Sequence, residues 1–128
     1  NHRMGLSDMV MLKDNHVDFA GGIKAAVART KAYLAQTNRT LAIEVETRNL
    51  QEVKEALQAG VDRIMLDNFT VSATKEAVEY IAGRTEVESS GGITRHTLVP
   101  YAECGVDYIS VGALTHHIKG LDMSLKAL

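Results

Sequence analysis

The feature of this sequence that most constrains its fold is a regular alternation of short apolar runs with longer segments of helical spacing. The runs have strand length, and the longer segments repeat apolar residues at the spacing of amphipathic helices. No hairpin signal joins one run to the next, so the strands are predicted to be parallel with right-handed crossovers. The predicted strands are 9–13, 40–46, 63–66, 85–89 and 107–111, and the predicted helices are 21–36, 49–59, 71–82 and a short one containing Pro100, with a loop through 14–16.

These five units predict an α/β fold, specifically a portion of a parallel (βα) barrel of the TIM type. An eight-stranded barrel of this type has ~250 residues, whereas this chain has 128. An irregular barrel and a small open sheet are the alternatives. The chain starts at Asn1 with residues that already look functional, so we expect a fragment of a longer protein.

Composition narrows the function classes. The formal net charge is −2 and the pI is about 6.2, which argues against extended binding to nucleic acid. No apolar run approaches the ~20 residues of a membrane-spanning helix. The single Cys104 cannot form an internal disulfide, which fits a reducing compartment, and we expect a cytoplasmic protein.

Each predicted strand ends in a polar residue or a glycine. In parallel βα proteins the functional site lies at the carboxyl ends of the strands, so these residues are predicted to converge on one mouth. A single charge at a strand end is most simply a solvated loop residue, but five consecutive units share the pattern. The residues are Lys13, Glu46, Asp67, Ser90 with Gly91, and Gly112 with His116 beyond it.

Two glycine-containing turns near the end of the chain predict a site for phosphate. The stretch 86–116 reads as strand, Ser-Gly-Gly turn, helix, strand, glycine turn and helix start. Adjacent turns of this kind offer backbone N–H groups and helix N-termini to an anion, without side chains to hold it away. The alternative is that Gly91, Gly92 and Gly112 only make tight turns.

Strand alternation predicts which side chains face the barrel interior. With Ile43 and Val45 turned towards the helices, Glu44 and Glu46 point inward. The same alternation places Asp67 on the face of Met65, and Ser90 on the face of Glu88. Glu44 and Glu88 then lie one layer below the mouth, where buried carboxylates need a partner such as Lys13 or Arg63.

These residue types together indicate a phosphorylated sugar that meets an anionic second substrate. Glu46 and Asp67 suit sugar hydroxyls or a magnesium ion, which prefers one or two carboxylates together with substrate phosphate and water. Arg3 offers a planar fork for a carboxylate, and Lys13 offers a point charge. His2 lies beside Arg3 in the sequence.

Several motifs resemble those of quinolinate phosphoribosyltransferases, in family order and over nearly the whole chain. They are NHRMGLSDMVMLKDNH, IEVET, IMLDNF, ESSGGI, GVDYISVGALTH and LDMSL. The resemblance implies a magnesium-dependent reaction in which quinolinate and phosphoribosyl pyrophosphate give nicotinate mononucleotide, pyrophosphate and carbon dioxide, in NAD biosynthesis. It also implies a cytoplasmic homodimer or higher homo-oligomer without nucleic-acid or membrane partners.

The resemblance assigns roles residue by residue. It implies catalytic roles for Lys13, Glu46 and Asp67, and magnesium binding, partly through water, by Glu46 and Asp67. The residues implied to bind quinolinate are His2, Arg3 and Lys13. Those implied to bind phosphoribosyl pyrophosphate are Glu46, Asp67, Ser90, Gly91, Gly92, Val111, Gly112, Ala113 and His116.

By the same resemblance, residues 1–128 are the C-terminal portion of the barrel catalytic domain, without the N-terminal sandwich domain and first barrel strands of the family. We therefore expect the fragment alone to be inactive. The chain has Thr115-His116-His117 where the family commonly has Thr-His-Ser. Two alternatives are a related barrel phosphoribosyltransferase that uses another acid, and a non-catalytic phosphate-binding fragment.

Overall fold

The computed structural model describes residues 8–119, so His2 and Arg3 lie outside the described residues. Strands and helices alternate along most of this range. The strands are β1 (Met9–Leu12), β2 (Ala42–Thr47), β3 (Arg63–Asp67), β4 (Glu86–Ser90), β5 (Tyr108–Val111) and β6 (Leu114–His117). The helices are α1 (Asp14–Ala20), α2 (Ile23–Gln36), α3 (Leu50–Ala59), α4 (Val71–Ile81) and α5 (Leu98–Glu103).

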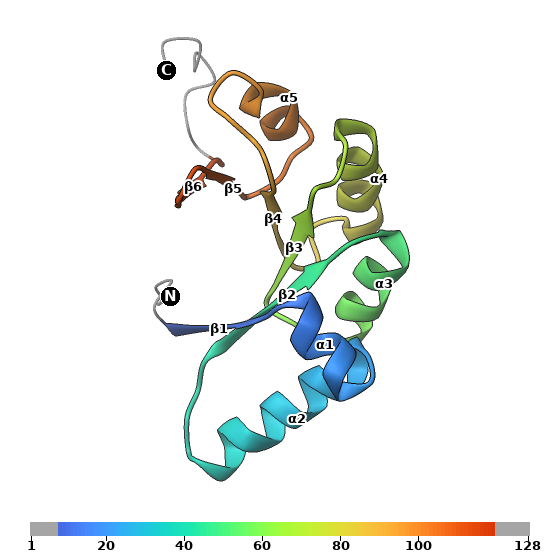
Figure 1. The fold of residues 1–128 in the computed structure, drawn as a ribbon, viewed down its shortest axis with the longest axis vertical. Helices are drawn as coiled ribbons and strands as arrows, with labels where there is room; N and C mark the ends of the chain where they lie inside the picture. Colours follow the sequence, from blue (N-terminus) through green and yellow to red (C-terminus); the bar gives the residue numbers. More distant parts are fainter. Residues whose placement is uncertain (1–7, 120–128) are drawn as a thin grey trace.

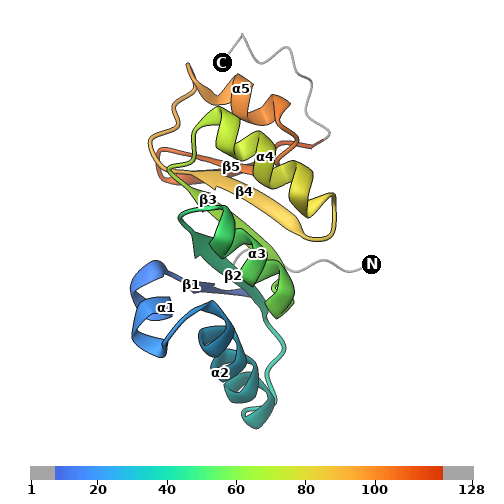
Figure 2. The same ribbon diagram turned by 90° about the vertical axis from the view of Figure 1, so that its right-hand side faces the viewer.

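The strands form one sheet in sequential order, β1 to β6. The strands β1 to β5 pair in parallel, and β6 pairs antiparallel with β5. The sheet curls, with helices on its outer side and the inner side left open (Figure 1). Seen from the helix side, α2, α3 and α4 lie in front of the strands (Figure 2). The predicted α/β barrel portion is confirmed as a half-barrel.

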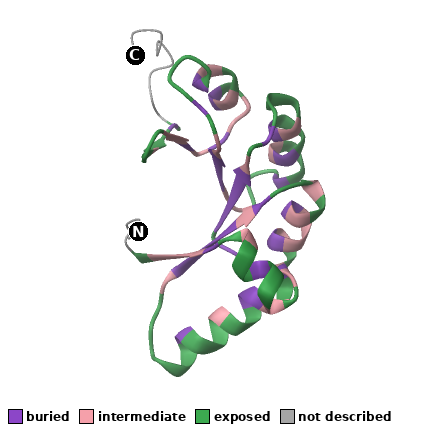
Figure 3. Ribbon diagram, in the orientation of Figure 1, coloured by how far each residue is buried: buried purple, intermediate pink, exposed green. Residues whose placement is uncertain are grey.

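The hydrophobic core lies between the sheet and the helices. The central strands β2, β3 and β4 are mostly buried, while β6 and the outward sides of the helices are exposed (Figure 3). Register aligns the apolar positions of neighbouring strands across the sheet, for example Val45 with Ile64 and Ile64 with Val87. The core side chains that are at most 1% exposed are Val45, Val53, Ala56, Ile64, Leu66, Ala77, Ile81, Val106 and Ile109. Their burial fixes the register, because a slip of one residue would turn every apolar side chain inward.

Local capping residues set the helix ends. Asn49 accepts a hydrogen bond from the backbone N–H of Glu52, and α3 ends at Gly60 with φ +77°, as predicted. Thr70 caps α4 in the same way, through Ala73. Within the described residues, no helix is long and apolar enough to cross a membrane.

Two aspartates tie down the N-terminal ends of the strands through a repeated Gly-Val-Asp sequence at 60–62 and 105–107. Asp62 donates its backbone N–H to the Ile43 carbonyl at 2.9 Å and accepts the Ile43 N–H on Oδ2 at 2.8 Å. Asp107 makes the same reciprocal pair with Val87, both bonds at 2.9 Å. Asp62 directly precedes β3, and Asp107 directly precedes β5. Each aspartate therefore uses its side-chain carboxylate to extend the parallel hydrogen-bond ladder beyond the start of its strand.

Two predictions about local structure were wrong. The segment after β1 is the helix α1, not a loop. Gly21, with φ +98°, ends that helix in a left-handed cap, so the Gly21-Gly22 pair separates two helices. The segment after β5 is the strand β6, not a helix start. Gly112 is the first residue of a two-residue hairpin turn and has φ +63°. Two-residue hairpin turns require a positive φ at this position, which glycine adopts readily.

Candidate active site

Two carboxylates meet at the C-terminal ends of β2 and β3. Glu46 and Asp67 are half-buried, and Glu46 accepts the backbone N–H of Asp14 at 2.9 Å. Burial raises the pKa of the Glu46 carboxyl; the Asp14 amide opposes this shift, while the charge and hydrogen bond of Asp67 reinforce it. The two carboxyls therefore lie close enough for the charge of Asp67 to act on Glu46.

This acidic pair fits the magnesium ion that the family resemblance implies. Magnesium is commonly held by one or two carboxylates, with substrate phosphate and water completing its shell. Among residues 8–119, no group of three or more histidine, cysteine or acidic side chains could hold a metal ion.

Lys13 follows β1 directly and stands at the start of α1. Its side chain is exposed, and its carbonyl accepts the N–H of Val17 at 3.0 Å, which fixes the backbone at this point. Asp14, the next residue, bonds Glu46, so the start of α1 is held against the end of β2. The predicted gathering of strand ends therefore includes Lys13, Glu46 and Asp67, which come from neighbouring strands.

The Ser-Gly-Gly turn packs directly against the end of β3. Ser90 is the register partner of Asp67, and its carbonyl accepts the N–H of Asn68 at 2.9 Å. A Cβ on Gly91 would lie 2.5 Å from Asn68 Oδ1 and 2.8 Å from its backbone nitrogen, whereas a Cβ on Gly92 would meet nothing within 4 Å. Gly91 is therefore required by packing, while Gly92 leaves open space above the turn.

The second glycine turn belongs to the β5–β6 hairpin, which changes its predicted geometry. The turn residues Gly112 and Ala113 are exposed, and Val111 is half-buried. His116 pairs with Ile109, so it lies back along β5 rather than beyond its end. Residues paired directly across two strands share a face of the sheet, and Ile109 belongs to the core face. The structure thus does not bring His116 to the cluster of strand ends, and its role as a ligand stays a prediction.

One layer below the mouth, on the inner face of the sheet, lies a cluster of polar side chains that is almost inaccessible to solvent. Glu44, Arg63 and Glu88 are 2%, 4% and 3% exposed, as strand alternation predicts for the two carboxylates. Arg63 Nη1 is 3.7 Å from Glu88 Oε1, and its guanidinium lies 3.6 Å from the ring centroid of Tyr108. Of the two partners predicted for these carboxylates, Arg63 is confirmed, whereas the Lys13 side chain is exposed.

The interior cluster keeps one carboxyl protonated. Burial, together with a hydrogen bond and the charge of Glu88, raises the pKa of Glu44 from 4.5 to about 9, and Arg63 offsets only part of this. Glu44 is therefore neutral at pH 7 and donates to Glu88. Sequence alternation identifies the burial of Glu44 but gives no signal for its protonation, which depends on the neighbouring strands.

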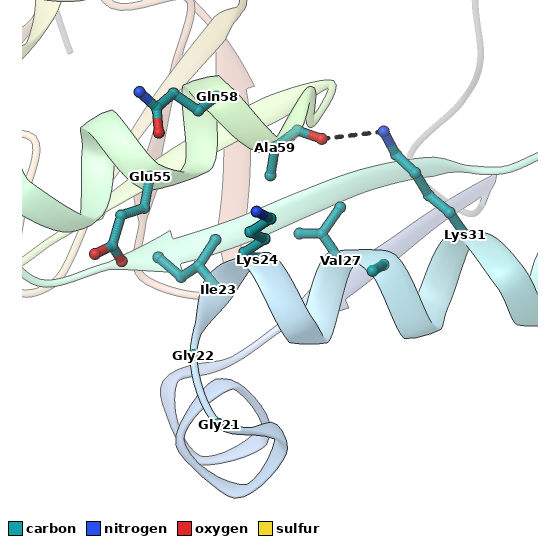
Figure 4. Close-up of a pocket in the computed structure, with 10 residues that line it drawn as sticks. Gly21, Gly22, Ile23, Lys24, Val27, Lys31, Glu55, Gln58 and Ala59 are labelled. Carbon is teal, nitrogen blue, oxygen red and sulfur yellow. Dashed lines mark hydrogen bonds between the residues drawn. The ribbon is translucent and has the colours of Figure 1, made fainter.

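A pocket of about 590 Å³ lies elsewhere, between α2 and α3 (Figure 4). Exposed lysines and Glu55 line it, and Lys31 Nζ donates to the carbonyl of Ala59 at 3.0 Å. That bond satisfies a carbonyl at the end of α3. None of the strand-end residues lines this pocket, so the candidate site is the cluster at the C-terminal ends of the strands.

A parallel half-barrel with an acidic pair and a glycine turn at its strand ends places this chain in the class of βα-barrel proteins with a polar mouth. The family model described as "Quinolinate phosphoribosyl transferase, C-terminal domain" matches residues 1–126. The chain therefore belongs to the quinolinate phosphoribosyltransferase family, and the predicted resemblance is confirmed.

Known proteins match nearly all of this chain, while the chain matches only part of them. A chloroplastic nicotinate-nucleotide pyrophosphorylase (carboxylating) of Arabidopsis thaliana is 50% identical, with the match covering 98% of this chain and 40% of the relative. The chain thus spans about two fifths of the length of that relative. Because the relative is named as chloroplastic, a cytoplasmic location does not follow from the family and stays a prediction.

Solved structures of the same family share the fold. The crystal structure of nicotinate-nucleotide pyrophosphorylase from Ehrlichia chaffeensis matches with a TM-score of 0.76 at 37% identity, covering 87% of this chain and 39% of that one. The enzyme from Francisella tularensis matches with a TM-score of 0.73 at 46% identity, covering 93% of this chain and 41% of that one. These matches support the half-barrel as part of a larger barrel.

Proposed function

We propose that residues 1–128 are the C-terminal portion of the barrel catalytic domain of a quinolinate phosphoribosyltransferase. The complete protein transfers the phosphoribosyl group of phosphoribosyl pyrophosphate to quinolinate, releasing pyrophosphate and carbon dioxide and giving nicotinate mononucleotide for NAD biosynthesis. The observation that carries this proposal is the convergence of Lys13, Glu46, Asp67 and Ser90 at the ends of four neighbouring strands, in a chain of this family.

The acidic pair serves the step in which pyrophosphate leaves the sugar. Positive charge develops on the ribose as the bond at the anomeric carbon stretches, and fixed carboxylates at Glu46 and Asp67 stabilise that charge. Asp14 holds Glu46 through its backbone N–H, so the carboxylate needs little reorganisation. A covalent nucleophile is unnecessary, because positioning of the two substrates supplies much of the rate enhancement.

Magnesium is the proposed cofactor, held by Glu46 and Asp67 partly through water. When bound, the ion neutralises charge on the pyrophosphate leaving group. The assignment is supported by the position of the two carboxylates at the ends of the neighbouring strands β2 and β3, where the charge of Asp67 helps to raise the pKa of Glu46.

The remaining ligands divide between the two substrates. Lys13, with His2 and Arg3, is proposed to bind the quinolinate carboxylates. The backbone of the Ser90-Gly91-Gly92 turn and of the Val111-Gly112-Ala113 turn is proposed to bind the 5′-phosphate. A role for His116 as a further ligand stays a prediction, because its pairing with Ile109 places it away from the strand ends. Gly92 supports this, since the space above it is open. After transfer, the positively charged pyridine nitrogen stabilises the electron pair left on the adjacent ring carbon when its carboxylate leaves as carbon dioxide, and that carbon takes up a proton from solvent to give nicotinate mononucleotide.

The complete protein is proposed to be a homodimer or higher homo-oligomer. The chain covers 40% of its Arabidopsis relative, so the remaining portion is expected to contribute further ligands and to close the barrel. For that reason the 128-residue chain alone is expected to be inactive. A related phosphoribosyltransferase that uses another acid is the second candidate, because the acidic pair and the glycine turns are proposed to contact the sugar phosphate and not the acid.

Product analysis of the complete enzyme tests this proposal. With phosphoribosyl pyrophosphate and magnesium, quinolinate should give one carbon dioxide per nicotinate mononucleotide, whereas nicotinate should give no product. Turnover of nicotinate without carbon dioxide would replace the proposal with the second candidate.

A lysine pair tests the role of Lys13. Lys13→Gln should raise the KM for quinolinate at least tenfold, because it removes a charge that pairs with a carboxylate. Lys24→Gln is the matched control, since Lys24 is also an exposed lysine near a helix start but lies outside the strand-end cluster. Equal quinolinate KM values in the two variants would remove Lys13 from the site.

A further inference from the structure

A short hydrogen bond joins the inner faces of β4 and β5. Ser110 Oγ donates to Glu88 Oε2 at 2.6 Å, and Ser110 Oγ also lies 3.0 Å from Thr115 Oγ1 on β6. Glu88 is 3% exposed. A hydrogen bond to a buried carboxylate is stronger than one between neutral groups, so the contact links three strands through a single serine hydroxyl.

Backbone pairing between β4 and β5 stops short of the proposed phosphate site. The two strands share only the pairs Glu88 with Tyr108 and Ser89 with Ile109. By contrast, β3 and β4 stay paired up to Asp67 with Ser90. The strands β4 and β5 are therefore free to separate just before the two glycine turns, and no ladder bond fixes the distance between those turns.

The serine–carboxylate bond lies at the point where this ladder ends. Glu88 is two residues before Ser90 and the Gly91-Gly92 turn, while Ser110 is two residues before Gly112. On the Glu88 side, Arg63 Nη1 forms an ion pair with the other carboxylate oxygen at 3.7 Å, without a hydrogen bond. On the Ser110 side, Thr115 ties the hydroxyl to the return strand of the hairpin. Each end of the bond is thus anchored to a different glycine turn.

We propose that Glu88 and Ser110 are positioning residues that hold the Val111-Gly112-Ala113 turn at a fixed distance from the Ser90-Gly91-Gly92 turn. The inference rests on the proposed function, because it treats the space between the two turns as the binding site for the 5′-phosphate. Neither side chain touches the substrate. Both act by setting the separation of backbone groups that do.

The test is steady-state kinetics of the complete enzyme with Ser110→Ala and a matched control, Ser89→Ala. Ser89 is buried on the opposite face of β4, and its hydroxyl has no hydrogen-bond partner among the described residues. Ser110→Ala should raise the KM for phosphoribosyl pyrophosphate about 10- to 150-fold, the loss expected for one hydrogen bond to a charged group. Its quinolinate KM should match that of Ser89→Ala, because the other half of the mouth is unchanged.

Two further variants separate positioning from general destabilisation. Ser110→Thr keeps a hydroxyl and should restore most of the affinity for phosphoribosyl pyrophosphate. Glu88→Ala should raise the same KM, and adding Ser110→Ala to it should have little further effect, because both changes break the hydrogen bond between Ser110 and Glu88.

The outcomes distinguish this inference from the proposed function. Equal phosphoribosyl pyrophosphate KM values for Ser110→Ala and Ser89→Ala in an enzyme that converts quinolinate would overturn the positioning role and leave the function intact. A wild-type enzyme that releases no carbon dioxide from quinolinate would instead refute the function before any variant is compared. Proportional increases in both substrate KM values would also overturn the inference, since they indicate a distorted barrel rather than a displaced turn.

Discussion

The two edges of the sheet use acidic residues in opposite ways. At the N-terminal edge, Asp62 and Asp107 each bond both backbone groups of one residue in the neighbouring strand. At the C-terminal edge, Glu46 and Asp67 approach each other, and Glu46 accepts one backbone N–H, that of Asp14. Carboxylates that satisfy backbone groups stabilise the fold, whereas carboxylates held together against their repulsion are arranged for a ligand.

The largest expected effect comes from the C-terminal edge. Asp67→Asn in the complete enzyme should lower kcat/KM by about 10²- to 10⁴-fold, because it removes a fixed charge from beside the developing cation. The melting temperature should stay the same or rise, since repulsion with Glu46 is relieved. Kinetics and thermal denaturation on the same samples check both parts, and a variant that loses stability as much as activity would place Asp67 with the structural aspartates.

The N-terminal edge should show the reverse pattern. Asp62→Ala removes the acceptor of the Ile43 N–H and should lower the free energy of unfolding by about 1–2 kcal/mol. Kinetic constants of the folded enzyme should change less than twofold. Asp62→Asn retains a carbonyl oxygen as acceptor and is the control. Denaturant titration measures the loss, and a large fall in kcat without destabilisation would contradict the contrast between the edges.

The smallest expected effect lies between the edges, at Glu44. Because the pKa of Glu44 is raised from 4.5 to about 9, the folded state keeps a proton that the unfolded chain releases above pH 4.5. Stability is therefore lost as pH rises through that window. Glu44→Gln keeps a donor to Glu88 without this penalty, and it should be more stable than wild type by about 1 kcal/mol or more at pH 8.

The same comparison at pH 4 provides the control for Glu44, because the carboxyl is then protonated in both states. Denaturation midpoints of the two proteins should converge at that pH and diverge steadily towards pH 8. A constant difference across the range would mean that Glu44 is ionised in the fold.

Sequence patterning predicted the parallel half-barrel because apolar alternation and helix caps are local signals. Asn49 and Gly60 cap the two ends of α3 as expected. The alternation of side chains along the strands correctly placed Glu44 and Glu88 in the buried interior. The α1 helix follows the end of β1, and the β6 strand follows a glycine turn. Both were missed because contacts with neighbouring strands, not the local sequence, determine the conformation of the chain after these points. Asp14, Asn68 and Ser110 were likewise missed, since their contacts join residues that lie 22 to 32 positions apart or belong to separate loops.

The close approach of Asn68 to Gly91 has a bearing on how homologues are interpreted. A side chain at position 91 would collide with the end of β3 even in a protein that binds nothing there. Retention of that glycine is therefore weak grounds for assigning phosphate binding to a divergent barrel. Position 92 is more informative, because no atom lies within 4 Å of a Cβ built there and its φ of +70° disfavours a larger residue without forbidding one such as asparagine.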